Sequence, residues 1–331
     1  MNTFLVTGGL GFIGSHYIDS IINNTKNFVI NLDKQTYASN KDRFLFNKNY
    51  KFVLGDICDE ELVESIFKKY DIDYVINFAA ESDVDNSYNN LNAFVKTNVL
   101  GTANLLNTAQ KYWKNKKNKR FIHISTDEVY GQSTQDVEFF ETDQLNPTSP
   151  YACTKAMAEM IVKNFVFNYN FPAIITRSSN NFGSYQHKEK LIPHTFLCCY
   201  QKSKIPLHKN SKYHKRNWLY VKDNVNAINL VLNRGKIGEI YNICSENELT
   251  NIEIIEKIIK YFNENCGGKL DNKSIKIVNI RPLDDARYNM NCDKIKNLGF
   301  VQTCFEKNFQ KTLNFFKNNV EYLLNQEKLK Q

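Results

Sequence analysis

Several features that would set a chain apart from ordinary globular proteins are missing from this sequence. Its longest apolar stretches, such as residues 74–80, fall far short of the ~20 residues that cross a bilayer. Phe4–Val6 runs directly into glycines and not into the apolar core of a signal peptide. We therefore expect a cytoplasmic protein that has no membrane segment.

Cysteines at metal-binding spacing are also absent. The eight cysteines form no CxxC pair, and only Cys198 and Cys199 are adjacent. Because structural zinc sites use paired, spaced thiolates, we expect no metal. Without an export signal, the simplest prediction is eight reduced thiols, mostly buried as small apolar groups.

The charge pattern lacks the signature of nucleic-acid binding. Lys and Arg exceed Asp and Glu by 43 to 35, a net charge of +8, but the excess is dispersed. The one basic cluster, residues 111–120, has no interleaved base-stacking aromatics and is expected to be a solvated loop. A basic chain suits an anionic small molecule, and we expect no nucleic-acid partner.

The first half of the chain alternates strand-like and helix-like segments. Strands are expected at 3–6, 28–32, 52–54, 74–78, 120–124 and 173–177, and helices at 13–22, 60–70, 92–113 and 150–169. This alternation predicts an α/β fold with a Rossmann-like, doubly wound parallel sheet.

After Ser178 the alternation loosens, although strand-like segments at 218–221 and 240–243 and helix-like segments at 252–262 and 305–323 remain. We expect a smaller α/β substrate-binding lobe here. The predicted dinucleotide-binding domain is 1–178 with a returning segment at about 217–243, and the predicted lobe is 179–216 with 244–331.

A glycine-rich turn joins the first strand to the first helix. Gly8, Gly11 and Gly14 permit a tight turn, close approach of a pyrophosphate to backbone N–H groups, and close packing of helix on strand. Asp33 ends the second strand, where its carboxylate can accept both hydroxyls of an adenosine ribose and repel a 2′-phosphate. The pattern therefore favours NAD over NADP, although Lys34 adds a positive charge beside Asp33.

Other residues at the carboxyl ends of strands are expected to line the same cofactor site, because ligands of open α/β sheets bind at that edge. The remaining predicted cofactor residues are Phe12, Ile13, Lys34, Thr36, Asp56, Ile57, Ala79 and Ala80.

Two further motifs indicate catalysis. Tyr151 and Lys155 stand four residues apart at the start of a predicted helix and so share one face. A nearby ammonium group and a bound nicotinamide cation both favour the phenolate, which lets a tyrosine act as a base. Asp127 and Glu128 follow the fifth strand, and if both line a cleft, their pKa values should separate into one acid and one base.

Together these motifs resemble the extended short-chain dehydrogenase/reductase superfamily. The stretch Ser125–Gly131 (STDEVYG) narrows the resemblance to its nucleotide-sugar 4,6-dehydratases, since the related 4-epimerases and decarboxylases lack the Asp–Glu pair. The resemblance runs from residue 3 to about 300. It includes residues 33–38, 79–82, 177–183, 189–193, 216–221 and 281–282.

The resemblance implies an NAD-dependent lyase that converts dTDP-glucose or UDP-glucose into the 4-keto-6-deoxyglucose nucleotide, towards a deoxysugar such as rhamnose. By this resemblance Tyr151 takes the 4-hydroxyl proton, Glu128 takes the C5 proton, and Asp127 protonates the departing 6-hydroxyl. Thr126 would bond the 4-oxygen, and Lys155 would also hold the nicotinamide ribose. A homodimer through the helices near 92–113 and 151–169 is implied as well.

The resemblance also supplies a set of substrate-binding residues: Ser82, Thr126, Asn181, Lys190, Leu191, Arg216, Asn251 and Arg281. The chain departs from the family at Asp83 and Asp284, where His is usual, and at Asn86, where Arg is common. These positions lie near the expected nucleotide, so thymine and uracil both stay open.

Three alternatives remain beside this hypothesis. A UDP-sugar 4-epimerase would return the hydride to C4, and a UDP-N-acetylglucosamine 4,6-dehydratase would accept an N-acetyl group. A pseudo-enzyme that only binds the dinucleotide is disfavoured, because the chain keeps Thr126, Asp127, Glu128, Tyr151 and Lys155 together.

Overall fold

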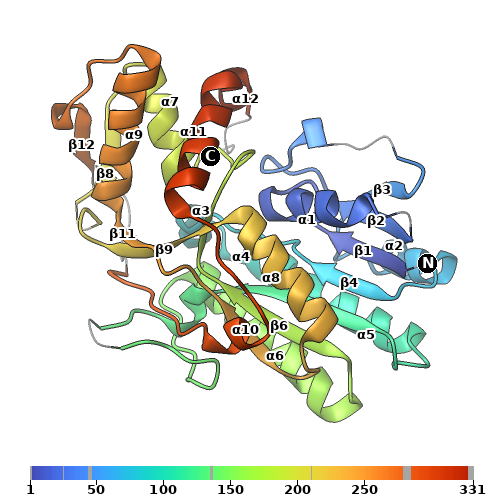
Figure 1. Cartoon of the computed structure of the whole chain (residues 1–331). Coiled ribbons are helices and arrows are strands. Elements are labelled where there is room, and N and C mark those ends of the chain that lie inside the picture. Colours follow the sequence, from blue (N-terminus) through green and yellow to red (C-terminus); the bar gives the residue numbers. More distant parts are fainter. Residues whose placement is uncertain are drawn as a thin grey trace.

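A seven-stranded parallel sheet forms the centre of the protein in the computed structural model, which describes residues 2–24, 26–43, 47–134, 137–209, 211–278 and 285–326 (Figure 1). From edge to edge the strand order is β10–β6–β5–β4–β1–β2–β3. The strands are β1 (Asn2–Thr7), β2 (Asn27–Asp33), β3 (Tyr50–Leu54), β4 (Tyr74–Asn77), β5 (Arg120–Thr126), β6 (Ala173–Ser178) and β10 (Ile240–Ile243).

Both faces of this sheet are covered by helices, as continuous apolar strands require. Leu5 packs with α2 (Glu60–Lys69) and α5 (Thr102–Tyr112) on one face. Its neighbour Val6 packs with α1 (Phe12–Ile22) and α8 (Val221–Arg234) on the other. The Rossmann-like, doubly wound α/β fold predicted from the sequence is therefore confirmed. The elements around the sheet are α1 (Phe12–Ile22), η1 (Lys41–Arg43), α2 (Glu60–Lys69), α3 (Val84–Asn89), α4 (Leu91–Phe94), η2 (Val95–Gly101), α5 (Thr102–Tyr112), η3 (Asp127–Tyr130), α6 (Pro150–Tyr169), α8 (Val221–Arg234) and α10 (Asp293–Asn297).

The long helix predicted at 92–113 is helical but not uniform. Its middle, η2, is a π-helix between the α-helical segments α4 and α5. Within it the buried Asn98 side chain accepts a hydrogen bond from the backbone N–H of Glu81 and donates to Thr154 Oγ1. Wider helical turns of this kind are common at functional sites. Apolar periodicity cannot reveal such a local change of winding.

A smaller lobe stands beside the carboxyl edge of the sheet, at the upper left of Figure 1. It contains a three-stranded sheet in the order β11–β9–β7 and a parallel pair of β8 and β12. The segment 217–243, which we predicted to return to the main sheet, is divided between the two parts. Its strand β10 pairs with β6 in the main sheet, whereas residues 217–220 lie in β9 of the smaller lobe. The lobe elements are β7 (Asn180–Phe182), α7 (Leu191–Tyr200), β8 (Ile205–His208), β9 (Lys215–Tyr220), β11 (Glu248–Thr250), α9 (Asn251–Cys266), η4 (Asn272–Ser274), β12 (Ile275–Val278), α11 (Phe305–Asn318) and α12 (Val320–Leu324).

One sequence prediction about the cysteines is wrong. Cys244, which follows β10, forms a disulfide with Cys292, which precedes α10, while the other six cysteines are free thiols. The two Cα atoms lie 6.0 Å apart although the residues are 48 positions apart in sequence. Folding brings this pair within disulfide range, and no spacing rule could have identified it.

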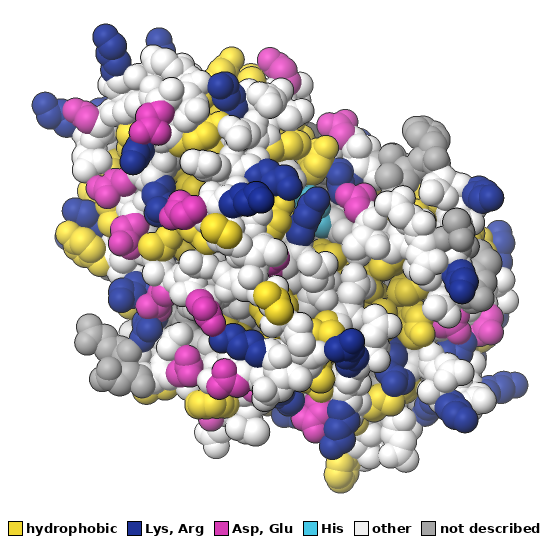
Figure 2. Space-filling view, in the orientation of Figure 1, with side chains coloured by type: hydrophobic (Ala, Val, Ile, Leu, Met, Phe, Trp, Pro, Cys, Tyr) yellow, Lys and Arg dark blue, Asp and Glu magenta, His cyan; other side chains and the backbone are white. Residues whose placement is uncertain are grey.

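The surface seen in Figure 2 carries Lys and Arg side chains on both parts of the molecule, interleaved with Asp and Glu. This distribution agrees with the dispersed positive charge of the sequence. None of the helices in the described residues is both long enough and apolar enough to span a bilayer.

Candidate active site

A cleft of about 730 Å³ lies between the carboxyl ends of the main strands and the smaller lobe. Its walls contain every described residue that we predicted for the site except Asp127, which is buried just behind the surface. Arg281 lies outside the described residues, as does Asp284. Residues predicted from separate motifs are thus brought to one cavity, of a size typical of ligand-binding clefts.

The glycine-rich turn forms one end of this cleft. Gly8 has a φ of +67°, and a Cβ on it would lie 2.7 Å from the backbone nitrogen of Ala79. A Cβ on Gly14 would lie 2.4 Å from the carbonyl oxygen of Gly8. Helix α1 begins after Gly11 with no side-chain cap and no acidic residue in its first turn. Its N–H groups can therefore bind an anion such as a pyrophosphate.

Asp33 and Lys34 complete this part of the site. The Asp33 carboxylate accepts hydrogen bonds from the Leu10 N–H at 2.9 Å and from Ser39 Oγ at 2.8 Å, which fix it beside the glycine-rich turn. Lys34 Nζ lies 3.1 Å from Glu81 Oε1 and also bonds Thr97 Oγ1. Since Glu81 neutralises Lys34, the site offers a carboxylate for ribose hydroxyls and no unopposed lysine for a 2′-phosphate. These residues fit NAD.

The acid pair stands on the short helix η3, directly after β5. Thr126 Oγ1 donates to Asp127 Oδ1 at 3.0 Å and accepts from the Glu128 N–H at 3.4 Å. Behind this turn, Arg177 donates to the Tyr130 hydroxyl at 2.6 Å and pairs with the buried carboxylate of Glu159 at 2.6 Å. These contacts hold the turn rigidly against the sheet, so the two acids are held at the edge of the cleft.

Asp127 has the surroundings of a proton donor. Only 3% of its surface is exposed, and its Oδ2 is buried without a hydrogen-bond partner. Burial raises the pKa of Asp127 to about 6, although Thr126 and the charge of Arg216 oppose the shift. A carboxyl group in this state keeps its proton closer to neutral pH than an ordinary aspartate does.

Tyr151 and Lys155 lie on one face of α6 and both line the cleft. Burial raises the pKa of Tyr151, and the charges of Glu128 and Asp127 raise it further, so the acid pair is close to the phenol. Lys155 Nζ donates to the carbonyl oxygen of Ile124 at 2.6 Å, and burial lowers its pKa to about 8. The bond to Ile124 thus fixes Lys155 on the helix face that it shares with Tyr151, and the protein's own groups keep Tyr151 protonated.

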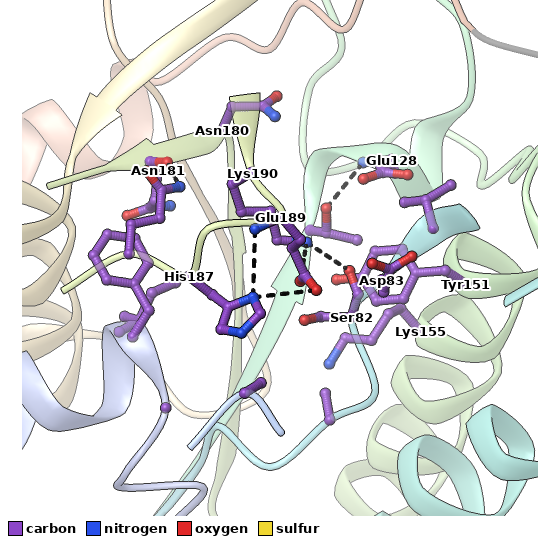
Figure 3. Close-up of a pocket in the computed structure, with 18 of the residues that line it drawn as sticks. Ser82, Asp83, Glu128, Tyr151, Lys155, Asn180, Asn181, His187, Glu189 and Lys190 are labelled. Atoms are coloured by element: carbon purple, nitrogen blue, oxygen red, sulfur yellow. Dashed lines mark hydrogen bonds and ion pairs between the residues drawn. The ribbon is translucent and has the colours of Figure 1, made fainter. Parts of the chain in front are cut away.

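Two of the predicted substrate residues, Ser82 and Thr126, lie on the sheet side of the cleft. The others, among them Asn181 and Lys190 in Figure 3, line the opposite wall. Lys190 Nζ lies 3.1 Å from Glu189 Oε1 and donates to the carbonyl oxygen of Ser82. Arg216 is directed to the carbonyl oxygens of Asp285 and Ala286, and its guanidinium stacks on the Tyr288 ring at 4.6 Å.

The amide side chains in this wall are also held by hydrogen bonds. Asn181 Nδ2 donates to the carbonyl oxygen of Ser179, and Asn181 Oδ1 accepts from Asn224. Asn251 begins α9 and donates to the carbonyl oxygen of Ser211.

Several cleft residues were not among the predicted site residues, although Asp83 was noted as a departure from the family and Glu189 lies in the matching stretch 189–193. Glu189 and Asp83 adjoin predicted residues, and their acidic side chains beside Lys190 were a usable signal. Asp285 and Tyr288 are different, because they reach the cleft from a segment more than a hundred residues after the catalytic helix. Within the described ranges, no cluster of three or more His, Cys, Asp or Glu side chains is arranged to hold a metal ion.

Known proteins are similar to this chain in both sequence and fold. The sequence model of the family described as GDP-mannose 4,6 dehydratase matches residues 5–312. A dTDP-glucose 4,6-dehydratase of Haemophilus influenzae is 41% identical, covering 96% of this chain and 99% of that protein. The dTDP-glucose 4,6-dehydratase of Bacillus anthracis, solved in complex with NAD, has a TM-score of 0.88 at 36% identity, covering 99% and 100% of the two chains.

An epimerase is also similar in structure. The UDP-glucose 4-epimerase of Thermotoga maritima, solved with UDP-glucose, has a TM-score of 0.86 at 26% identity, covering 96% of this chain and 99% of that one. The fold is therefore common to both kinds of enzyme. Sequence identity is higher to the dehydratases.

Proposed function

Since the chain belongs to the nucleotide-sugar 4,6-dehydratase family, we propose that it uses NAD to dehydrate dTDP-glucose to the 4-keto-6-deoxyglucose nucleotide. The observation that carries this proposal is that Glu128 and Tyr151 line one cleft and that Asp127, buried directly behind its surface, acts electrostatically on the same phenol. An epimerase needs only the oxidation and reduction at C4, which Tyr151 serves, and has no use for a second pair of acids. Elimination of water needs both an acid and a base.

The proposed roles follow from the environment of each group. NAD, when bound, would accept a hydride from C4 of the sugar and later return it to C6. The protein's own groups raise the pKa of Tyr151, but the Lys155 ammonium and the positive nicotinamide ring of bound NAD would favour its phenolate. The phenolate then takes the proton of the 4-hydroxyl, and Thr126 hydrogen-bonds the 4-oxygen. Once C4 is a ketone, the C5 proton is acidic enough for Glu128 to remove. Asp127, whose pKa burial raises to about 6, protonates the departing 6-hydroxyl, and water is lost. Glu128 then returns a proton to C5.

The binding groups are proposed as well. The turn at Gly8, Gly11 and Gly14, together with Asp33, holds the dinucleotide, and Lys155 holds its nicotinamide ribose. Lys190, Arg216, Asn181 and Asn251 bind the nucleoside diphosphate. Arg281 and Asp284 lie outside the described residues, so the preference for thymine over uracil rests on the similarity to dTDP-glucose dehydratases.

The direct test is to incubate the NAD-loaded protein with dTDP-glucose and with UDP-glucose and to compare the specificity constants for 4-keto-6-deoxy product. We expect dTDP-glucose to be preferred. Tyr151→Phe should lower turnover by about 10²–10⁴-fold while NAD stays bound. If the main product were the 4-epimer, or if neither sugar were converted, the proposal would be wrong.

We also propose a homodimer that forms through α6. The exposed positions 153, 157, 160, 164 and 167 form one stripe along this helix and carry Cys, Met, Met, Asn and Phe, none of them charged. A solvent-facing helix side normally carries charges, so a second copy of this face is the occupant we propose. Met160→Glu should convert the dimer into a monomer in sedimentation equilibrium.

The reaction product would serve the synthesis of 6-deoxysugars such as rhamnose. The cytoplasmic location of the protein stays a prediction.

A further inference from the structure

Two loops from opposite sides of the cleft touch each other at a pair of rings that has no role in the chemistry described above. Tyr37 stands in the loop that follows β2, directly after the predicted cofactor residue Thr36. His187 stands in the segment that precedes α7 in the smaller lobe. Their ring centroids lie 5.4 Å apart, edge to face, at 81°. The contact therefore joins the cofactor side of the molecule to the substrate side.

Glu189 strengthens this junction. Its carboxylate lies 3.1 Å from Lys190 Nζ and 3.3 Å from His187 Nδ1, and that ring nitrogen accepts a hydrogen bond from the Glu189 backbone N–H at 3.4 Å. Burial by itself raises the pKa of Glu189. The charges of Lys190 and His187 outweigh burial and lower this pKa to about 2. The Tyr37 hydroxyl faces the same carboxylate. Burial raises the pKa of Tyr37, and the charge of Glu189 raises it further. Glu189 is thus an ionised residue that contacts both rings, His187 through its backbone N–H and carboxylate and Tyr37 through its carboxylate.

A further contact extends the junction to a third loop. Lys190 Nζ donates to the carbonyl oxygen of Ser82, which lies in the loop after β4, at 3.1 Å. The loops after β2 and β4 are those that carry Thr36, Ala79 and Ala80, residues of the predicted cofactor site. Because β1 and β4 lie between β2 and β5 in the sheet, a dinucleotide that extends from Asp33 to Lys155 crosses the ends of these strands. The junction therefore adjoins its path at two of the loops.

His187 also has an unused polar atom at the cleft. The residue is 8% exposed and lines the cleft, and its Nε2 is buried with no hydrogen-bond partner. Figure 3 shows the ring beside Glu189, with its second nitrogen on the side turned away from that carboxylate. A buried polar atom without a partner is costly, so this nitrogen is suited to bond a group that a ligand brings.

We propose that Tyr37 and His187 form a latch across the bound dinucleotide and slow its release during the reaction. The inference rests on the proposed function. In that reaction the hydride taken from C4 must return to C6 of the same sugar, so a reduced cofactor that escaped between the two steps would leave an unfinished product. A latch that spans the cofactor side and the substrate side meets this need.

The test measures release of NAD directly. The NAD-loaded protein is mixed with an excess of a fluorescent NAD analogue, and the rate of exchange is recorded for wild type, His187→Ala and Tyr37→Phe. Because His187 supplies both the ring contact to Tyr37 and the Nε2 available to a ligand, we expect His187→Ala to release NAD about tenfold faster or more. Tyr37→Phe keeps the ring contact and loses only the hydroxyl that faces Glu189, so a smaller increase is expected. Tyr213→Phe, at a side chain 71% exposed, is the matched control and should exchange like wild type.

A second readout follows turnover. With dTDP-glucose, His187→Ala should lose activity as cycles accumulate, and added NAD should restore it, whereas wild type should need no added NAD. Unchanged exchange in His187→Ala, with wild type active on dTDP-glucose, would refute the latch and leave the function standing. Absence of conversion by wild type would instead refute the function, whatever the exchange rates. If His187→Ala does not fold, His187→Gln and Tyr37→Phe give the same test.

Discussion

The two walls of the cleft each bury an acidic side chain, and the pKa values of the two shift in opposite directions. On the sheet side, burial raises the pKa of Asp127 to about 6. On the lobe side, Lys190 and His187 outweigh burial and lower the pKa of Glu189 to about 2. Both carboxyl groups are largely shielded from water, so burial alone does not decide the protonation state.

The two pKa values shift in opposite directions because the two carboxyl groups have different neighbours. Asp127 Oδ2 has no hydrogen-bond partner, and the cation that acts on it, Arg216, is directed to the carbonyl oxygens of Asp285 and Ala286. Glu189 has two cationic or ionisable partners within 3.3 Å. The sheet side is therefore arranged to hold and release a proton, and the lobe side to keep fixed charges for binding.

The strongest test of this comparison is to remove the proposed base on the sheet side. Glu128→Gln should still permit oxidation at C4 but lower the rate of water loss by about 10²–10⁴-fold, because the amide cannot take the C5 proton. Reduced nicotinamide should then accumulate on the enzyme and be visible by its absorbance. Glu189→Gln, on the other wall, is the control and should still eliminate water once substrate is bound. Normal product formation by Glu128→Gln would contradict the assignment.

The sheet side was also the side that sequence could predict best. Gly8, Asp33, Asp127 and Tyr151 stand at strand ends or at the start of a helix, where local spacing fixes their position. Asp285 and Tyr288 reach the cleft only through tertiary packing, and the Cys244–Cys292 disulfide depends on the same kind of long-range contact. Sequence patterns record local geometry, so they predicted the strands and the residues that gather at the strand ends, and missed these contacts.

A second prediction concerns the pH dependence of stability at Asp127. Its folded pKa of about 6 exceeds the ordinary value of 3.8, so the folded state binds more protons between these values and loses stability as pH rises through them. Asp127→Asn keeps an acceptor for Thr126 and never ionises. It should be more stable than wild type by about 2–3 kcal/mol at pH 8, with the difference vanishing below about pH 4. Urea unfolding across this range measures it, and equal stability at pH 8 would contradict the raised pKa.

The smallest expected effect is the loss of stability on replacing Glu189, which is opposite in sign to the gain expected for Asp127→Asn. The folded pKa of Glu189, about 2, lies below the ordinary value of 4.5, so its ion pairs stabilise the folded protein above that value and are lost as pH falls towards 2. Because the Lys190 side chain is 37% exposed, solvent weakens the pair, and Glu189→Gln should cost about 1–2 kcal/mol at pH 7. The cost should shrink as pH falls below about 4, in contrast to Asp127→Asn, whose gain disappears there. If both variants followed the same pH trend in urea unfolding, burial and not partnership would govern the two carboxyl groups, and the contrast between the walls would fail.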